Sequence, residues 1–156
     1  MHEDAKLSDG VVTLSPLAPG EPDPVPALHD PRLRAAWRVH GPSRAFGIGA
    51  DETVGTLRLC PAAAGLVQGD VEVSYALLPE ARGRGLATRA VRLACAHVRA
   101  QGARRAVILV PAGPAAPAAV AGVSAVARRA GFTRRGQISH ADGALWDWYV
   151  RLLRRA

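Results

Sequence analysis

A cluster of glycines and arginines follows directly after a predicted strand and opens a predicted helix. The strand, Asp70 to Leu78, alternates apolar and polar residues, ends at Pro79 and is followed by Arg82-Gly83-Arg84-Gly85. Glycines let the backbone turn inward, and the first N–H groups of a helix lack intrahelical partners and attract negative charge. The spacing therefore predicts a site for a phosphorylated ligand. On the glycines alone, a tight turn with solvated arginines is an equal alternative.

Two common phosphate-binding loops do not fit this segment. Gly83-Arg84-Gly85 is followed by Leu86, Ala87 and Thr88. It therefore lacks both the Gly-Lys-Ser/Thr ending of a P-loop and the Gly-x-Gly-x-x-Gly of a dinucleotide fold.

The elements that must position this loop alternate between strands and helices. Apolar periodicity, prolines and glycines predict strands over 11–17, 44–48, 53–59, 70–78, 105–110, 132–138 and 145–152, and helices over 31–40, 86–100 and 114–130. Six prolines between Pro16 and Pro31 predict an irregular connection, and residues 1–10 are expected to be loosely held. The order predicts one mixed α/β domain over residues 1–156.

Composition excludes several classes of protein. The chain has 156 residues, 49% of them hydrophobic, and no segment approaches the roughly 20 apolar residues of a membrane span. Cys60 and Cys95 have neither metal-site spacing nor a secreted context, and the N-terminus has no apolar run like that of a signal peptide. We therefore expect a cytoplasmic protein with reduced thiols and no metal.

The charge is unevenly distributed. Residues 1–80 hold 6 basic and 11 acidic side chains, a balance of −5, and residues 81–156 hold 14 basic and 2 acidic ones, a balance of +12. A basic half indicates an anionic partner, which can be nucleic acid, a membrane surface or a phosphorylated cofactor. No helix-turn-helix pattern or alternation of aromatic and basic residues favours nucleic acid, which ranks behind the cofactor.

The loop resembles the acetyl-CoA loop of the GNAT superfamily of N-acetyltransferases, Gln/Arg-x-x-Gly-x-Gly/Ala, at Arg82, Gly85 and Ala87. The likeness to the RimJ/RimL-type branch extends over residues 44–153. It is carried by the segments Val71–Tyr75, Leu78–Val91, Val126–Phe132 and Trp148–Leu153.

This resemblance implies a mixed, mostly antiparallel sheet of six or seven strands flanked by helices, with acetyl-CoA as co-substrate. Its pyrophosphate would meet the loop and the N–H groups from Arg84 to Thr88. The pantetheine arm would lie along the strand that ends at Ala76, Leu77 and Leu78, where it splays from the strand 105–110. An N–H near Ala76 or Leu77 would then stabilise the developing oxyanion. The cofactor-binding residues expected are Ala76, Leu77, Leu78, Arg82, Gly83, Arg84, Gly85, Leu86, Ala87 and Thr88.

Two residues are candidates for catalysis. The family often places an acidic residue at the position of Glu72, which can take the proton of the attacking amine or instead pair with an arginine. The branch's Asn-x-x-Ser motif would fall at Val120 and Val123, which cannot hydrogen-bond through their side chains. Ser124, one position away, can act as general acid or be simply a small helix residue.

The resulting hypothesis is direct acetyl transfer from acetyl-CoA to a primary amine, either a protein N-terminus or a small amine. An acyl-CoA-binding protein without efficient transfer is the first alternative and a nucleic-acid-binding protein the second. The resemblance also leaves a homodimer through edge strands open.

Overall fold

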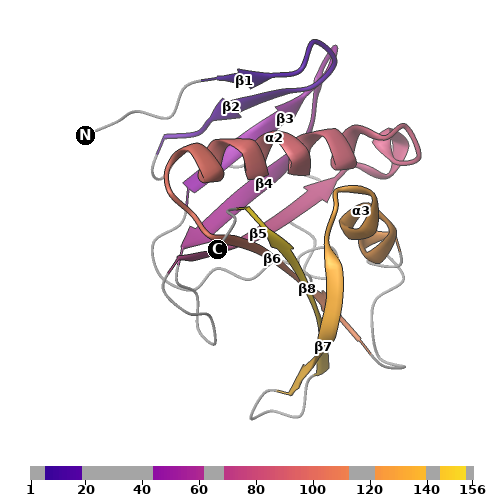
Figure 1. Cartoon of the computed structure of the whole chain (residues 1–156). Helices are drawn as coiled ribbons and strands as arrows, with labels where there is room; N and C mark the ends of the chain where they lie inside the picture. Colours follow the sequence, from indigo (N-terminus) through magenta and orange to yellow (C-terminus); the bar gives the residue numbers. More distant parts are fainter. Residues whose placement is uncertain (1–5, 19–43, 62–68, 113–121, 140–144, 154–156) are drawn as a thin grey trace.

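The computed structural model describes residues 6–18, 44–61, 69–112, 122–139 and 145–153 (Figure 1). The predicted helix over 31–40, most of the proline-rich connection and Val120 lie outside the described residues.

The described part of the chain forms an eight-stranded sheet in the order β1-β2-β3-β4-β5-β6-β8-β7. Every neighbouring pair is antiparallel except β5 and β6, which are parallel. The strands are β1 (Leu7–Ser8), β2 (Thr13–Pro16), β3 (Arg44–Gly49), β4 (Thr53–Pro61), β5 (Asp70–Leu77), β6 (Arg105–Pro111), β7 (Thr133–Ser139) and β8 (Leu145–Leu152). The described helical segments are the 3-10 turn η2 (Pro79–Ala81) and the helices α2 (Leu86–Ala100) and α3 (Val123–Arg129).

The predicted mixed, mostly antiparallel sheet is confirmed, with one strand more than expected. The strand predicted over 11–17 is confirmed as β2 at Thr13–Pro16, and Leu7–Ser8, which pair with Leu14 and Thr13, add an edge strand that was not predicted. The Asp9 carboxylate accepts the N–H groups of Val11 and Val12 at 2.9 and 2.8 Å and closes the turn between the two strands. The expectation that residues 1–10 are loosely held is therefore wrong for Leu7–Ser8.

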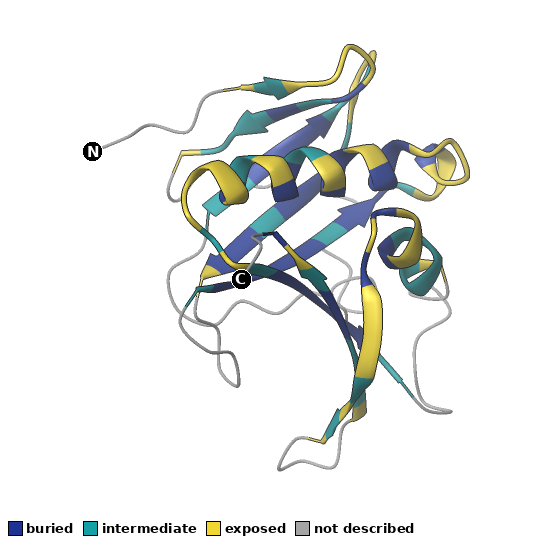
Figure 2. Cartoon of the chain, viewed as in Figure 1, coloured by how far each residue is buried: buried dark blue, intermediate teal, exposed yellow. Residues whose placement is uncertain are grey.

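Two helices and the sheet enclose the main core. α2 and α3 lie on the same side of the sheet (Figure 1), and Figure 2 shows α2 with its buried residues toward the strands and its exposed residues outward. The predicted apolar face of α2 is confirmed, since Leu86, Ala90, Val91, Ala94 and Val98 are all buried in this core. Only the last part of the predicted helix 114–130 can be compared, and it ends at Ala130 and Gly131 as expected.

The alternation of β5 assigns its side chains to two faces. Val71, Val73 and Leu77 belong to the core under the helices. The residues between them, Glu72 and Ser74, therefore point to the opposite face, which we call the distal face. On this face Val107, Leu109 and Val150 form a second, smaller apolar cluster, against which Trp146 and Trp148 pack.

The pairing of β5 with β6 stops after three residue pairs, the last of which is Glu72 with Val107. β5 continues to Leu77 and β6 to Pro111. Past Glu72, β5 keeps its pairing with β4 and β6 keeps its pairing with β8. The two strands therefore separate, and the sheet has a gap between the end of β5 and the end of β6.

An ion pair holds the closed end of this gap. The guanidinium of Arg105 donates to both carboxylate oxygens of Asp70, Nε to Oδ1 at 2.8 Å and Nη2 to Oδ2 at 2.6 Å. The Asp70 side chain is only 2% exposed, and that of Arg105 is 29% exposed. Because a bidentate pair also fixes orientation, it locks β5 against β6 at the residues just before they diverge.

We predict that Arg105→Met lowers the free energy of unfolding by about 2 to 3 kcal/mol, since it leaves the buried Asp70 carboxylate without its partner. The exposed pair of Arg134 with Asp147, at 3.0 Å, provides the matched control. Arg134→Met should cost less than about 1 kcal/mol. Denaturant unfolding measures both, and equal losses for the two variants would contradict the role assigned to the buried pair.

Candidate cofactor and catalytic site

The loop between β5 and α2 has the backbone of an anion site. Gly83 and Gly85 have positive φ of 78° and 75°, and Gly85 is the N-cap of α2 without a side-chain cap hydrogen bond. The helical hydrogen bonds begin at Arg89, whose N–H donates to the carbonyl of Gly85. The N–H groups of Leu86, Ala87 and Thr88 thus precede the helical ladder and are free to bind an anion. No acidic residue lies in the first turn to compete for them.

The arginines near this loop differ in the contacts that they make. Arg82 donates from Nη2 to the carbonyl of Leu77 at 3.2 Å and so ties the loop to the end of β5. Arg92 donates to the carbonyl of Arg129 at 2.6 Å. Arg84 is exposed, and within the described residues it has no hydrogen bond or ion pair. Of these side chains, Arg84 is the one available to a ligand.

Arg89 is also engaged within the fold, by the carboxylate of Asp9. Its Nη1 lies 3.0 Å from Asp9 Oδ2. The backbone N–H of Val12, more than the arginine, lowers the pKa of Asp9. The contact ties α2 to the turn between β1 and β2, and it removes Arg89 from the charges that face the loop.

The gap between β5 and β6 begins on the same strand that leads into this loop. The N–H of Leu78 donates to the carbonyl of Val54 on β4, at 2.9 Å. Backbone groups alternate in direction along a strand, so the N–H of Ala76 also faces β4, whereas those of Tyr75 and Leu77 face the gap. Of the two predicted oxyanion donors, Leu77 is therefore the one directed to the gap, and Ala76 is not.

Glu72 lies at the point where β5 and β6 part. It is buried on the distal face, directly opposite Cys60 on β4 and Val107 on β6. Arg58 occupies the diagonal position on β4, because its direct partner is Ser74. Arg58 is therefore the arginine with which Glu72 would pair if its role is structural.

Ser124 lies on the other side of the sheet. It is half-buried in the first turn of α3, next to Val123, which packs against the core under the helices. Within the described residues the side chain of Ser124 makes no hydrogen bond. Ser124 and Glu72 therefore flank the sheet from opposite faces, and the structure does not bring the two predicted catalytic residues together on one face.

Sequence reasoning missed two residues of the distal face, Thr56 and Ser74. Both are buried, and neither hydroxyl has a hydrogen-bond partner. A buried hydroxyl without a partner costs about 1–3 kcal/mol. The alternation of β5 alone could have placed Ser74 on the same face as Glu72. Thr56 becomes a neighbour of Ser74 only through the register of β4 with β5.

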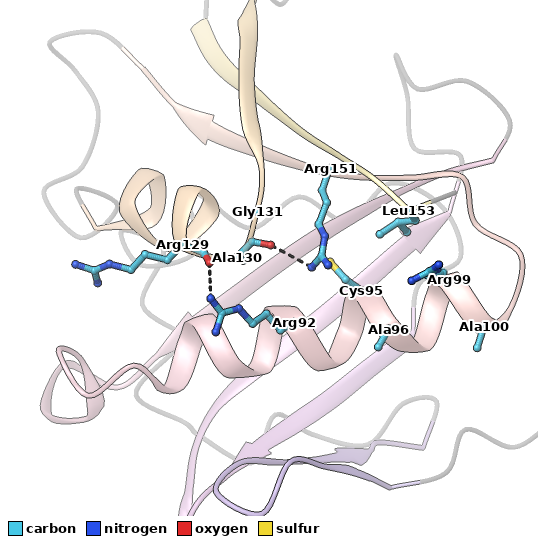
Figure 3. Close-up of a pocket in the computed structure, with 10 residues that line it drawn as sticks. All are labelled: Arg92, Cys95, Ala96, Arg99, Ala100, Arg129, Ala130, Gly131, Arg151 and Leu153. Atoms are coloured by element: carbon cyan, nitrogen blue, oxygen red, sulfur yellow. Dashed lines mark hydrogen bonds between the residues drawn. The ribbon is translucent and has the colours of Figure 1, made fainter. Parts of the chain in front are cut away.

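A cavity of about 1010 Å³ lies at the other end of α2, and four of the ten residues that line it are arginines (Figure 3). Arg92 and Arg151 donate to the carbonyls of Arg129 and Ala130, at 2.6 and 3.1 Å. These bonds satisfy carbonyls at the C-terminal end of α3, where cations are favourable. Helix capping thus accounts for Arg92 and Arg151, and the cavity is separate from the loop before α2.

Cys95 in the wall of this cavity is not a nucleophile. Burial raises the pKa of its thiol to about 11, against the opposing effect of Arg151. The thiol thus stays protonated near neutral pH. In the described part of the chain, no three His, Cys, Asp or Glu side chains gather to hold a metal ion, and none of its helices is long and apolar enough to cross a membrane.

The fold is an α/β fold in which the start of α2 lies close in sequence to the gap between two parallel strands. The sequence model of the acetyltransferase (GNAT) family matches residues 13–132. The chain belongs to this family.

Solved structures share the fold at low sequence identity. RimL, a ribosomal L7/L12 alpha-N-protein acetyltransferase, in complex with coenzyme A is 19% identical, with a TM-score of 0.68 over 95% of this chain and 98% of that one. The Salmonella typhimurium acetyltransferase that modifies the N-terminal serine of L7/L12 is 21% identical, with a TM-score of 0.65 over 92% and 96%. The microcin C7 self-immunity acetyltransferase MccE, in complex with acetyl-CoA and AMP, is 14% identical, with a TM-score of 0.65 over 92% and 93%. No curated protein matches the chain in sequence.

We predict that Gly85→Ala lowers the free energy of unfolding by about 1 kcal/mol, because a Cβ disfavours φ near 75°. An added Cβ would meet nothing within 4 Å at Gly85 or at Gly122, which has φ −85° and caps α3. Gly122→Ala is therefore the control and should cost nothing. Equal losses in thermal unfolding would show that the left-handed conformation of the loop is not the cause.

Proposed function

We propose that this protein is an N-acetyltransferase that passes the acetyl group of acetyl-CoA directly to a primary amine. The observation that carries the proposal is the position of the gap. β5 leaves β6 at Glu72, borders the opening as far as Leu77 and then enters the glycine-arginine loop. One strand thus connects an anion site with an opening in the sheet, as a ligand with a pyrophosphate and an extended arm requires.

The loop would hold the pyrophosphate of acetyl-CoA. Backbone N–H groups of Leu86, Ala87 and Thr88 supply neutral donors, and the positive φ of Gly83 and Gly85 shapes the backbone into a concave anion-binding turn. Arg84 adds a full positive charge. Arg82 acts indirectly, since its bond to the carbonyl of Leu77 holds the loop beside the gap.

The pantetheine arm would run through the gap and pair with the edge of β5. Tyr75 and Leu77 direct their N–H groups into this opening. The thioester carbonyl placed near Leu77 would accept its N–H, and this bond strengthens as negative charge develops on the oxygen during attack.

In the transfer step, the lone pair of the amine nitrogen attacks the thioester carbon and forms the new C–N bond. The tetrahedral intermediate then collapses, the C–S bond breaks and CoA leaves as a thiolate. Glu72, at the start of the gap, takes the proton that the amine must lose, directly or through water. Ser124 is the candidate donor of the proton that the thiolate takes up.

The acceptor is either a protein N-terminus or a small amine. The names of RimL and of the Salmonella protein support the first, and that of MccE shows that the same fold serves other acetylation reactions. The chain's acidic half, which contains Glu72, favours a cationic amine over an acidic substrate.

A protein that binds acyl-CoA without efficient transfer is the second candidate. The observation in its favour is Val123, an apolar side chain packed against the core in the first turn of α3, where the RimJ/RimL-type motif has a hydrogen-bonding residue. Release of CoA thiol in the presence of amines separates the two candidates, because only the transferase produces it.

We predict that Arg84→Ala weakens acetyl-CoA binding about tenfold, the effect of losing one charge-assisted hydrogen bond to a phosphate. Arg99→Ala is the matched control, since Arg99 is an exposed arginine near the far end of α2. Its affinity for acetyl-CoA should equal that of the wild type in isothermal titration calorimetry. Equal weakening in the two variants would mean that general positive charge, and not the loop, attracts CoA.

We predict that Glu72→Gln lowers kcat about 100-fold, because general base catalysis contributes on the order of 10² to 10⁴ in rate. The wild-type rate should fall at low pH as Glu72 takes a proton, and the variant should lose this dependence while its KM for acetyl-CoA is unchanged. A correctly folded variant with the wild-type pH profile would remove Glu72 from the mechanism and leave pairing with Arg58 as its role.

A further inference from the structure

The cavity beside the C-terminal half of α2 gathers positive charge around an open space. Its four arginines come from three elements, Arg92 and Arg99 from α2, Arg129 from the end of α3 and Arg151 from β8. None of its ten lining residues is acidic. Its volume of about 1010 Å³ is at the upper end of the range for small-molecule sites, roughly 300–1,000 Å³. Like charges around such a space repel one another, and a bound anion relieves the repulsion.

Acidic side chains that could neutralise this cavity are scarce in its half of the chain. Residues 81–156, to which all ten lining residues belong, hold two acidic side chains. Asp142 lies outside the described residues, and Asp147 pairs with Arg134 on β7 at 3.0 Å. In the described part of the chain, no ion pair includes any of the four arginines of the cavity. Their charges are therefore open to an anion from solution.

Three of the guanidinium groups lie along one face of α2. Arg92, Cys95 and Arg99 are three and four residues apart and thus share a face of the helix. Arg151 reaches from β8 to the thiol of Cys95, between the two arginines of α2 (Figure 3). The seven residues from Arg92 to Arg99 span about 10 Å of helix, and we call this line of charges the arginine row. Figure 3 shows Arg129 pointing away from it.

Two members of the arginine row are held in place before any ligand binds. Arg92 donates to the carbonyl of Arg129 at 2.6 Å, and Arg151 donates to that of Ala130 at 3.1 Å. Each bond uses one of the five N–H donors of a guanidinium, so other donors remain for a ligand. The bond of Arg92 also directs it to α3 and away from the loop before α2. Side chains fixed in this way lose little conformational freedom when an anion binds.

We propose that the arginine row binds a small multivalent oxyanion, a molecule with two or more phosphate or carboxylate groups. Guanidinium groups bind both kinds of oxyanion through paired N–H···O bonds. No aromatic side chain lines the cavity, so a nucleobase has nothing to stack on, which disfavours nucleic acid. Because the row is separate from the loop before α2, this anion and CoA can occupy the protein together.

Isothermal titration calorimetry of the CoA-saturated protein with tripolyphosphate and with citrate tests the site and distinguishes a phosphate from a carboxylate ligand. We expect one saturable site for at least one of the two anions. Arg99→Ala should weaken this binding about tenfold through the loss of one charge-assisted hydrogen bond. Arg135→Ala is the matched control, since it removes the same charge from an exposed position on β7 outside the cavity, and its affinity should be unchanged.

Arg99 is exposed, and within the described residues no hydrogen bond or ion pair holds it, so Arg99→Ala should unfold at the wild-type Tm. Absence of binding for both anions would overturn the proposal. Equal weakening by Arg99→Ala and Arg135→Ala would also overturn it, because it would mean a general attraction to a basic protein.

The inference does not depend on acetyl transfer, and Arg84→Ala keeps the two sites apart. In this variant, with or without CoA, tripolyphosphate should bind the arginine row with the wild-type affinity. Weakening by Arg84→Ala but not by Arg99→Ala would place the anion in the loop before α2 and overturn the proposal. A protein that binds no CoA but binds tripolyphosphate through Arg99 would contradict the proposed function alone.

Discussion

The rest of the site depends on the separation of two parallel strands. β5 and β6 are held together at Asp70 and Arg105 by a buried bidentate ion pair and part after Glu72 and Val107. A continuous sheet would satisfy every backbone group along β5 and leave none for a ligand. The separation turns the β6-facing edge of β5, with the N–H groups of Tyr75 and Leu77, into a surface that another extended molecule can pair with. Glu72, the gap and the anion loop follow one another along this single strand.

Four arginines of the positive half make contacts that serve the fold. Arg105 neutralises a buried carboxylate, Arg89 pairs with Asp9, and Arg92 and Arg151 bond to carbonyls at the end of α3. The +12 balance of residues 81–156 therefore does not require a nucleic-acid partner. Near the loop, the side chain of Arg84 and the backbone N–H groups at the start of α2 remain available to a ligand.

Local patterns in the sequence predicted the elements whose apolar spacing and flanking residues agree. Helix α2 was expected at its observed bounds, because its apolar spacing and the flanking glycines agree. The loop was also expected, since its glycines and arginines are contiguous. The two hairpin pairings, β3 with β4 and β7 with β8, follow from such patterns, whereas the register and the pairing of other strands do not. The edge strand Leu7–Ser8 is short and exposed, and its place depends on the Asp9 turn and on Arg89 from a distant helix. Likewise, Arg58 becomes a neighbour of Glu72, and Thr56 a neighbour of Ser74, only through the register of β4 with β5.

The central claim is that acetyl-CoA occupies the gap between β5 and β6, with its pyrophosphate at the start of α2. A crystal structure of the protein with CoA tests this most directly. The account predicts phosphate oxygens within hydrogen-bond distance of the N–H groups of Leu86, Ala87 or Thr88, and the pantetheine arm paired with Tyr75 or Leu77. CoA bound instead in the arginine-lined cavity beside Cys95, or β5 and β6 paired beyond Glu72 in the complex, would contradict it.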